Sequence, residues 1–142
     1  MAYDARALVQ RWFDEVWNKR RDESIDELMA SQSVGHVEGG TVDGPDGFRK
    51  MRAMFLSAIP DVRIDLEDIV ADGDRAAVRW RARGTHSGEG FGIPPTDRPV
   101  DFTGSSWFHV RDGKFIEGWD TWNLHGLLGE LQAPPAEVKK LF

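Results

Sequence analysis

Three polar side chains, Asp120, His86 and Ser106, fall at even-numbered positions of predicted strands in which the even positions are otherwise mainly apolar. A carboxyl group in an apolar cavity has a raised pKa, because burial disfavours its charged form, and it can then exchange protons near neutral pH. A histidine beside it could share that work, since imidazole changes charge between about pH 5 and 8. These residue types indicate general acid/base catalysis, with Asp120 and His86 as the candidate catalytic residues.

Each residue also has a structural interpretation. Asp120 precedes a short predicted helix by about three residues and could cap its N-terminus. His86 could be an ordinary buried or loop-edge histidine. The chain has no cysteine and 4 histidines, of which no pair has the helical spacing of a zinc site, so we expect neither a metal nor a cofactor.

The elements that position these residues follow from the hydrophobic period. Apolar residues recur at three- and four-residue spacings in segments that begin near Asp4, at 22–24 and at Gly44, which predicts three helices. Pro60 ends the third. From Asp61 onward the period changes to about two, which predicts long antiparallel strands and an α+β fold.

Strand parity then assigns the two faces of the sheet. Alternate side chains point to opposite faces, so the apolar set must face the helices. The predicted inward set consists of Val62, Ile64, Leu66, Ala76, Val78, Trp80, Val100, Phe102, Phe108 and Ile116. The odd-numbered face mixes charges with Trp107 and Trp119, which favours a homodimer interface on this outer face.

The inward residues also predict a binding pocket for a flat or hydrophobic ligand. Its sheet wall would contain Trp80, Phe102, Ser106 and Phe108, and its helical wall Met51 and Phe55. His36, beside a glycine turn, is placed at the pocket mouth or on the surface.

Length and charge limit the classes of protein and partner. The 142 residues fit a single domain, expected at 1–131 with a tail at 132–142. The net charge of −6 argues against nucleic acid as a partner. No apolar run approaches the roughly 18 residues that span a bilayer, and the N-terminus lacks signal-peptide features, so we expect a cytoplasmic protein without membrane partners.

The loop at 84–96, Gly-Thr-His-Ser-Gly-Glu-Gly-Phe-Gly-Ile-Pro-Pro-Thr, together with Ile-Pro-Asp at 59–61, the segment 112–119 and the closing segment 126–131, resembles the SnoaL-like polyketide cyclase family. The resemblance extends from about residue 8 to residue 131. It implies a cone-shaped α+β barrel, as in nuclear-transport-factor-like and ketosteroid-isomerase-like proteins, in which a curved antiparallel sheet and N-terminal helices enclose a deep pocket.

Cyclases of this family close a ring by intramolecular aldol condensation of a polyketide ester without metal or organic cofactor, and an aspartate on the last strand acts as acid and base. The resemblance assigns that role to Asp120. Family members often carry a second aspartate three residues later, where this chain has Asn123, and a glycine where it has Asp97. Position 120 or position 123 could therefore correspond to the family's acid/base site. The single tyrosine, Tyr3, argues against a ketosteroid-isomerase oxyanion hole.

These observations predict that Asp120 removes a proton from a carbon beside carbonyl groups, while His86 or Ser106 stabilises the enolate oxygen. The expected partner is a small hydrophobic molecule that contains carbonyl groups. Two alternatives remain. An enzyme like limonene epoxide hydrolase would need arginine near the aspartate, whereas Arg79, Arg81 and Arg83 have outward parity. A non-catalytic ligand-binding protein would need only the pocket.

Overall fold

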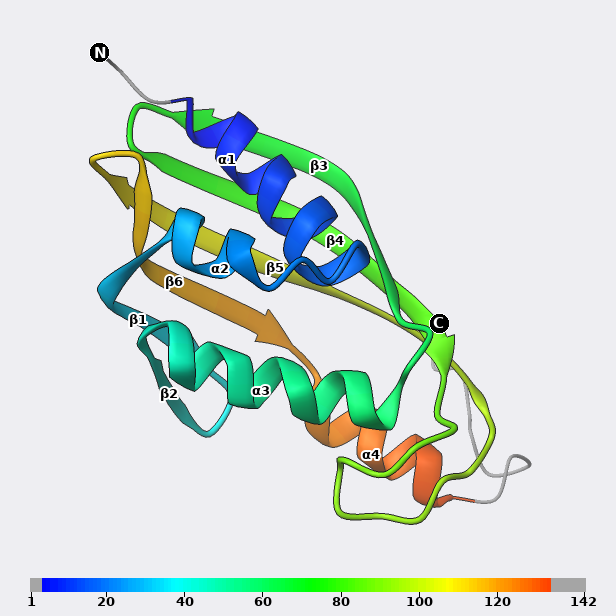
Figure 1. The fold of residues 1–142 in the computed structure, drawn as a ribbon. Coiled ribbons are helices and arrows are strands. Elements are labelled where there is room, and N and C mark those ends of the chain that lie inside the picture. Colours follow the sequence, from blue (N-terminus) through cyan, green and yellow to red (C-terminus); the bar gives the residue numbers. More distant parts are fainter. Residues whose placement is uncertain (1–3, 134–142) are drawn as a thin grey trace.

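A curved six-stranded sheet carries helices on one face in the computed structural model, which describes residues 4–133 (Figure 1). Tyr3 and the predicted tail beyond Ala133 lie outside this range. In chain order the elements are α1 (Ala5–Arg11), its π-helical continuation η1 (Trp12–Asn18), α2 (Glu23–Leu28), β1 (Met29–Val37), β2 (Gly40–Asp43), α3 (Gly44–Ala58), β3 (Arg63–Asp72), β4 (Arg75–Thr85), β5 (Pro99–Arg111), β6 (Lys114–Trp122) and α4 (Leu124–Gln132).

The strand order β2-β1-β6-β5-β4-β3 confirms the predicted α+β fold. The strands from β3 to β6 form the expected antiparallel meander. β1 pairs with β6 in parallel, which the α3 helix and the four strands between them in sequence allow, so the sheet is mixed. The edge strands β2 and β3 do not pair with each other, and the sheet stays open.

Helix positions follow local signals in the sequence. The Asp4 side chain accepts hydrogen bonds from the backbone N–H groups of Arg6 and Ala7 at the start of α1. Pro45 lies in the first turn of α3, where a missing N–H costs nothing. Within residues 4–133, no helix is long and apolar enough to cross a membrane.

Two bulges modify the predicted parity. In β5 and β6 the register shifts beside His109 and Val110, so Phe115 pairs with Val110 and is buried. The prediction that Ile116 faces inward was therefore wrong, because the bulge puts Phe115 in its place. From Gly118 onward, opposite Phe108, the even-numbered residues of β6 again face the helices. A second shift, between Leu66 and Asp68 of β3, turns odd-numbered residues toward the core from Ile69 onward.

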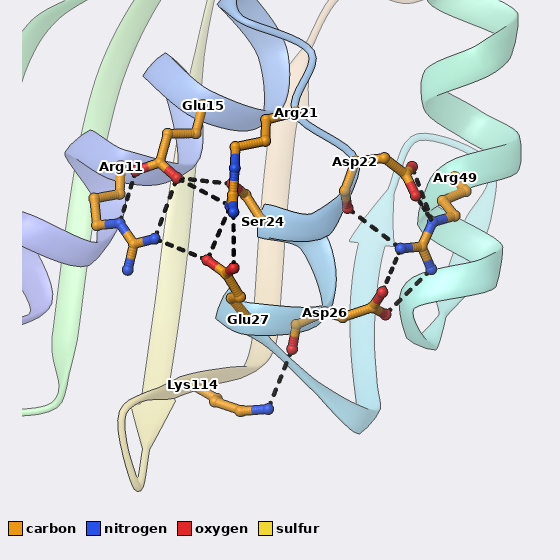
Figure 2. A network of polar contacts seen from close by, with 9 residues as sticks. All are labelled: Arg11, Glu15, Arg21, Asp22, Ser24, Asp26, Glu27, Arg49 and Lys114. Atoms are coloured by element: carbon orange, nitrogen blue, oxygen red, sulfur yellow. Dashed lines mark hydrogen bonds and ion pairs between the residues drawn. The ribbon is translucent and has the colours of Figure 1, made fainter.

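A charged network on the outside of the helices joins α1, η1, α2 and α3 (Figure 2). Glu15 accepts hydrogen bonds from Arg11 and Ser24, which lower its pKa to about 2. On the other side of α2, Arg49 of α3 bonds both Asp22 and Asp26. The short helix α2 is thus fixed between its longer neighbours by ion pairs as well as by its buried side chains.

Candidate functional site: a polar group in an aromatic cavity

A cavity of about 200 Å³ lies between the sheet and the helices. Its walls are mainly apolar, and include Trp12, Trp17, Phe48, Met51, Phe55, Trp80, Phe102, Phe108 and Trp122. The rings of Phe102 and Trp122 are stacked, with centroids 4.7 Å apart. Since pockets for drug-sized ligands measure roughly 300–1,000 Å³, this smaller cavity fits a ligand of one or two rings or one part of a longer molecule.

The cavity brings together every predicted site residue except the two histidines. The residues so placed are Asp120, Ser106, Trp80, Phe102, Phe108, Met51 and Phe55. This arrangement arises because the even-numbered side chains of β4 and β5 point toward the helices. Met51 and Phe55 are four residues apart, so they lie on one face of α3.

The polar centre of the cavity is a chain of hydrogen bonds across three neighbouring strands. Trp80 Nε1 on β4 donates to Ser106 Oγ on β5 at 2.9 Å. Ser106 Oγ in turn lies 2.5 Å from Asp120 Oδ1 on β6, to which it donates. The indole N–H can only donate, so the single hydroxyl proton of Ser106 is directed at Asp120.

Burial raises the pKa of the Asp120 carboxyl above its ordinary value, and the hydrogen bond from Ser106 opposes that rise. Burial is the larger effect, so the proton affinity of this group is increased. Oδ2 makes no hydrogen bond within residues 4–133, although Asp120 lines the cavity. One oxygen is therefore fixed by the protein while the other has no protein partner.

Asp120 is not the cap of the last helix. Asn123 Oδ1 accepts from the backbone N–H of Gly126, and Glu38 Oε2 accepts from that of Leu124. Asn123 is not among the residues that line the cavity. Of the two candidate positions, 120 and 123, only the first presents its side chain to the cavity.

The structure does not bring His86 into the cavity. Its ring is fully buried and stacks on Phe91 with centroids 5.9 Å apart. His86 Nδ1 accepts from the backbone N–H of Thr96 at 3.2 Å, and the backbone groups of His86 bond Asp97 and Arg98. His86 thus closes the base of the loop between β4 and β5, which lies beside α3 and α4 (Figure 1).

The structure also places His36 away from the cavity wall. Its ring stacks on Trp119, which has outward parity, and its Nε2 lies 2.7 Å from Glu117 Oε2. Its neighbours Gly35 and Val37 line the cavity instead. This is the alternation expected of a strand.

No arginine hydrogen-bonds Asp120 within the part of the chain that the structure describes. Arg81 forms a bidentate pair with Asp101 at 2.7 and 2.5 Å on the outer face, as its parity predicted. The arrangement that would favour epoxide opening is therefore not formed at Asp120.

The sequence did not indicate Ser33, which lines the same cavity. Its side chain is buried because it lies on the same face of β1 as Gly35 and Val37, which also line the cavity. The sequence predicts only a short extended segment here, and its position against β6 depends on pairing with a strand that is distant along the chain.

The model of the SnoaL-like polyketide cyclase family matches residues 7–131. A candidate SnoaL-like polyketide cyclase from Jannaschia sp. CCS1 is 25% identical and has a TM-score of 0.84, with 92% of each chain covered. AclR, a candidate hydroxylase from Streptomyces galilaeus, is 30% identical with a TM-score of 0.81, over 96% of this chain and 85% of AclR. IdmH, a candidate polyketide cyclase from Streptomyces antibioticus, is 30% identical with a TM-score of 0.79, over 92% of this chain and 100% of IdmH. No curated protein sequence matches the chain.

Proposed function

The chain belongs to the SnoaL-like polyketide cyclase family, and from this membership we propose that it catalyses an acid/base ring closure on a hydrophobic carbonyl compound, with Asp120 as the catalytic residue. The observation that carries the proposal is the environment of Asp120: a partly buried carboxyl group of raised pKa on the wall of an aromatic cavity, held through one oxygen only.

In the proposed reaction, Asp120 takes a proton from a carbon that lies between carbonyl groups. The resulting enolate carbon attacks a second carbonyl carbon of the same molecule, a carbon–carbon bond forms, and the protonated Asp120 returns its proton to the new alkoxide. The raised pKa suits both halves, because it makes the carboxylate a stronger base and keeps the acid form available. The reaction rearranges protons and one carbon–carbon bond, so its balance needs no oxidant or cofactor.

Ser106 acts on Asp120 rather than on the substrate. With its proton directed at Oδ1, it orients the carboxylate and cannot also stabilise the enolate oxygen. The stacked rings of Phe102 and Trp122 offer a flat surface for a planar dicarbonyl. A carbon between two carbonyl groups is already acidic, so its deprotonation requires only a positioned substrate and a base.

The test is exchange of the acidic proton of a β-keto ester in deuterated buffer. We expect the wild type to accelerate exchange. In Asp120→Asn the rate should fall by about 10²–10⁴-fold, which is the rate enhancement that a general base usually provides. Asp68→Asn is the matched control, since this exposed carboxylate on β3 has no hydrogen-bond partner within residues 4–133. Equal rates in the wild type, in Asp120→Asn and in buffer alone would reject the proposal in favour of a binding protein.

We further propose that a second copy of the chain covers the outer face of the sheet. Trp107 on this face is 57% exposed and lies opposite Trp119 in the register of β5 and β6. Both signs of charge lie near these rings in the strand register, as with Arg79 and Glu117, which suits a surface that pairs with itself. Sedimentation should show a dimer that Trp107→Glu converts to a monomer, and a monomeric wild type would reject the interface.

A further inference from the structure

Ser33 on β1 is a buried hydroxyl that the fold leaves without a partner. Its side chain is 4% exposed, and its Oγ makes no hydrogen bond within residues 4–133. The same residue lines the aromatic cavity that contains Asp120. A buried polar group of this kind is unusual, because most such groups find a partner in the protein or in water.

The other buried serines behave as expected. Ser24 donates to Glu15 and accepts from Arg21, and Ser106 links Trp80 to Asp120. The fold therefore satisfies the hydroxyls that face its own polar groups. Ser33 lines the cavity as Ser106 does, but no protein group bonds its hydroxyl and the surrounding wall is mainly apolar, so we expect its partner to come from what fills the cavity.

The register of β1 and β6 places Ser33 far from Asp120. Gly35 pairs with Gly118 and His36 with Trp119, so Val37 is the next residue along and lies beside Asp120. Ser33 precedes Val37 by four residues, of which the step from Ser33 to Val34 lies in the irregular part of β1, so the separation is about 1 nm at roughly 3.3 Å per strand residue. Ser33 and Asp120 are therefore separate polar points of the same cavity, whose lining also includes Glu38 and Glu117.

We propose that Ser33 binds an oxygen atom of the ligand, by donating its hydroxyl hydrogen to a carbonyl oxygen or to the oxygen of a hydroxyl group. The ligand is then an elongated, largely apolar molecule with a polar oxygen about 1 nm from the part that faces Asp120. That Asp120 faces the reacting carbon rests on the proposed function. The hydrogen bond from Ser33 to the ligand does not depend on the proposed function, because it concerns ligand binding alone.

The experiment compares two probes that differ by one carbonyl oxygen, 1-indanone and indane, whose dissociation constants are measured by isothermal titration. We expect the wild type to prefer 1-indanone by about 3- to 10-fold, the effect of one hydrogen bond. Ser33→Ala should reduce this preference to less than about 2-fold. Ser31→Ala, which changes an exposed serine of the same strand, should retain it, and so should Asp120→Asn.

Three outcomes would overturn the inference: a preference that persists in Ser33→Ala, a preference lost only in Asp120→Asn, or no binding of either probe. Thermal unfolding without ligand gives an independent readout. A hydroxyl kept for a ligand has no bond to lose, so Ser33→Ala should keep or raise the wild-type Tm, and a lower Tm or failure to fold would show a structural role. If Ser33 governs the preference while β-keto ester exchange is not accelerated, the proposed reaction fails and the Ser33 subsite stands.

Discussion

The hydroxyl of Ser106 on β5 donates to Asp120 Oδ1 on β6 over 2.5 Å, and the two residues are direct partners in the antiparallel register. Cross-strand partners are the nearest side chains on one face of a sheet. The contact is therefore part of the sheet itself, and it holds the carboxyl group in one orientation toward the cavity.

Ser106→Ala should move the pH profile of exchange upward. The base works when ionised, so the rate rises as pH increases through the pKa of Asp120, and the lost hydrogen bond would raise that pKa further. Exchange rates across pH measure the shift. Ser105→Ala, on the outer face, is the control, and an unchanged profile in Ser106→Ala would contradict the assigned role.

Asp120→Asn should be more stable than the wild type at pH 7. The pKa of Asp120 is raised in the folded state, so folding favours the protonated form and the ionised group destabilises the protein above its unfolded pKa of about 3.9. The amide removes that cost, and we expect Tm to rise by roughly 2–5 °C. The advantage should disappear below about pH 4, where Asp120 is protonated in both states. A variant with a lower Tm at pH 7 would show that the ionised group stabilises the fold.

His86→Ala should destabilise the fold without removing the base. Loss of the hydrogen bond from Thr96 and of the stacking on Phe91 should cost about 1–3 kcal/mol and loosen the loop between β4 and β5. Urea unfolding measures the loss, and β-keto ester exchange should keep its wild-type pH midpoint. His109→Ala is the control on the outer face. Loss of exchange at wild-type stability would instead place His86 in the chemistry.

Gly104→Ala should disturb the cavity, because an added Cβ would collide with Trp80 and Trp122. Overpacking of this kind costs about 1–3 kcal/mol, and the displaced indole would weaken its bond to Ser106. Gly129→Ala in α4 is the matched control: nothing lies within 4 Å of the added Cβ, and alanine in a helix gains about 0.5–1 kcal/mol. Thermal unfolding should move in opposite directions for the two variants, and a shared direction would contradict the packing described.

Glu15→Gln should reduce stability in a pH-dependent way. The pKa of Glu15 is lowered to about 2, so its contribution is complete above its unfolded value of 4.5 and is lost as pH falls toward 2. Exposure to solvent keeps that contribution at about 1 kcal/mol. Unfolding free energies should therefore differ at pH 6 and converge near pH 2. Asp14→Asn, whose ion pair with Lys19 is well exposed, should have no measurable effect.

The sequence alone determined most of the fold and the inner face of its central strands. Period-two alternation is a local property, so Trp80, Ser106 and Phe108 could be placed on one wall before any contact was known. The inward direction of Asp120 followed from the same parity. It held because the bulge at Ile116 affects one position, after which the even residues face inward again.

Only the tertiary structure decided which polar groups meet. The bond between Ser106 and Asp120 depends on the register of β5 and β6, and the place of Ser33 in the same cavity depends on the pairing of β1 with β6, strands far apart along the chain. His86 shares the parity of Asp120, yet it lies where β4 gives way to a loop, and its ring nitrogen bonds Thr96. Alternation fixes the face of a side chain, whereas its partner is set by hydrogen bonds between distant segments, which no local pattern specifies.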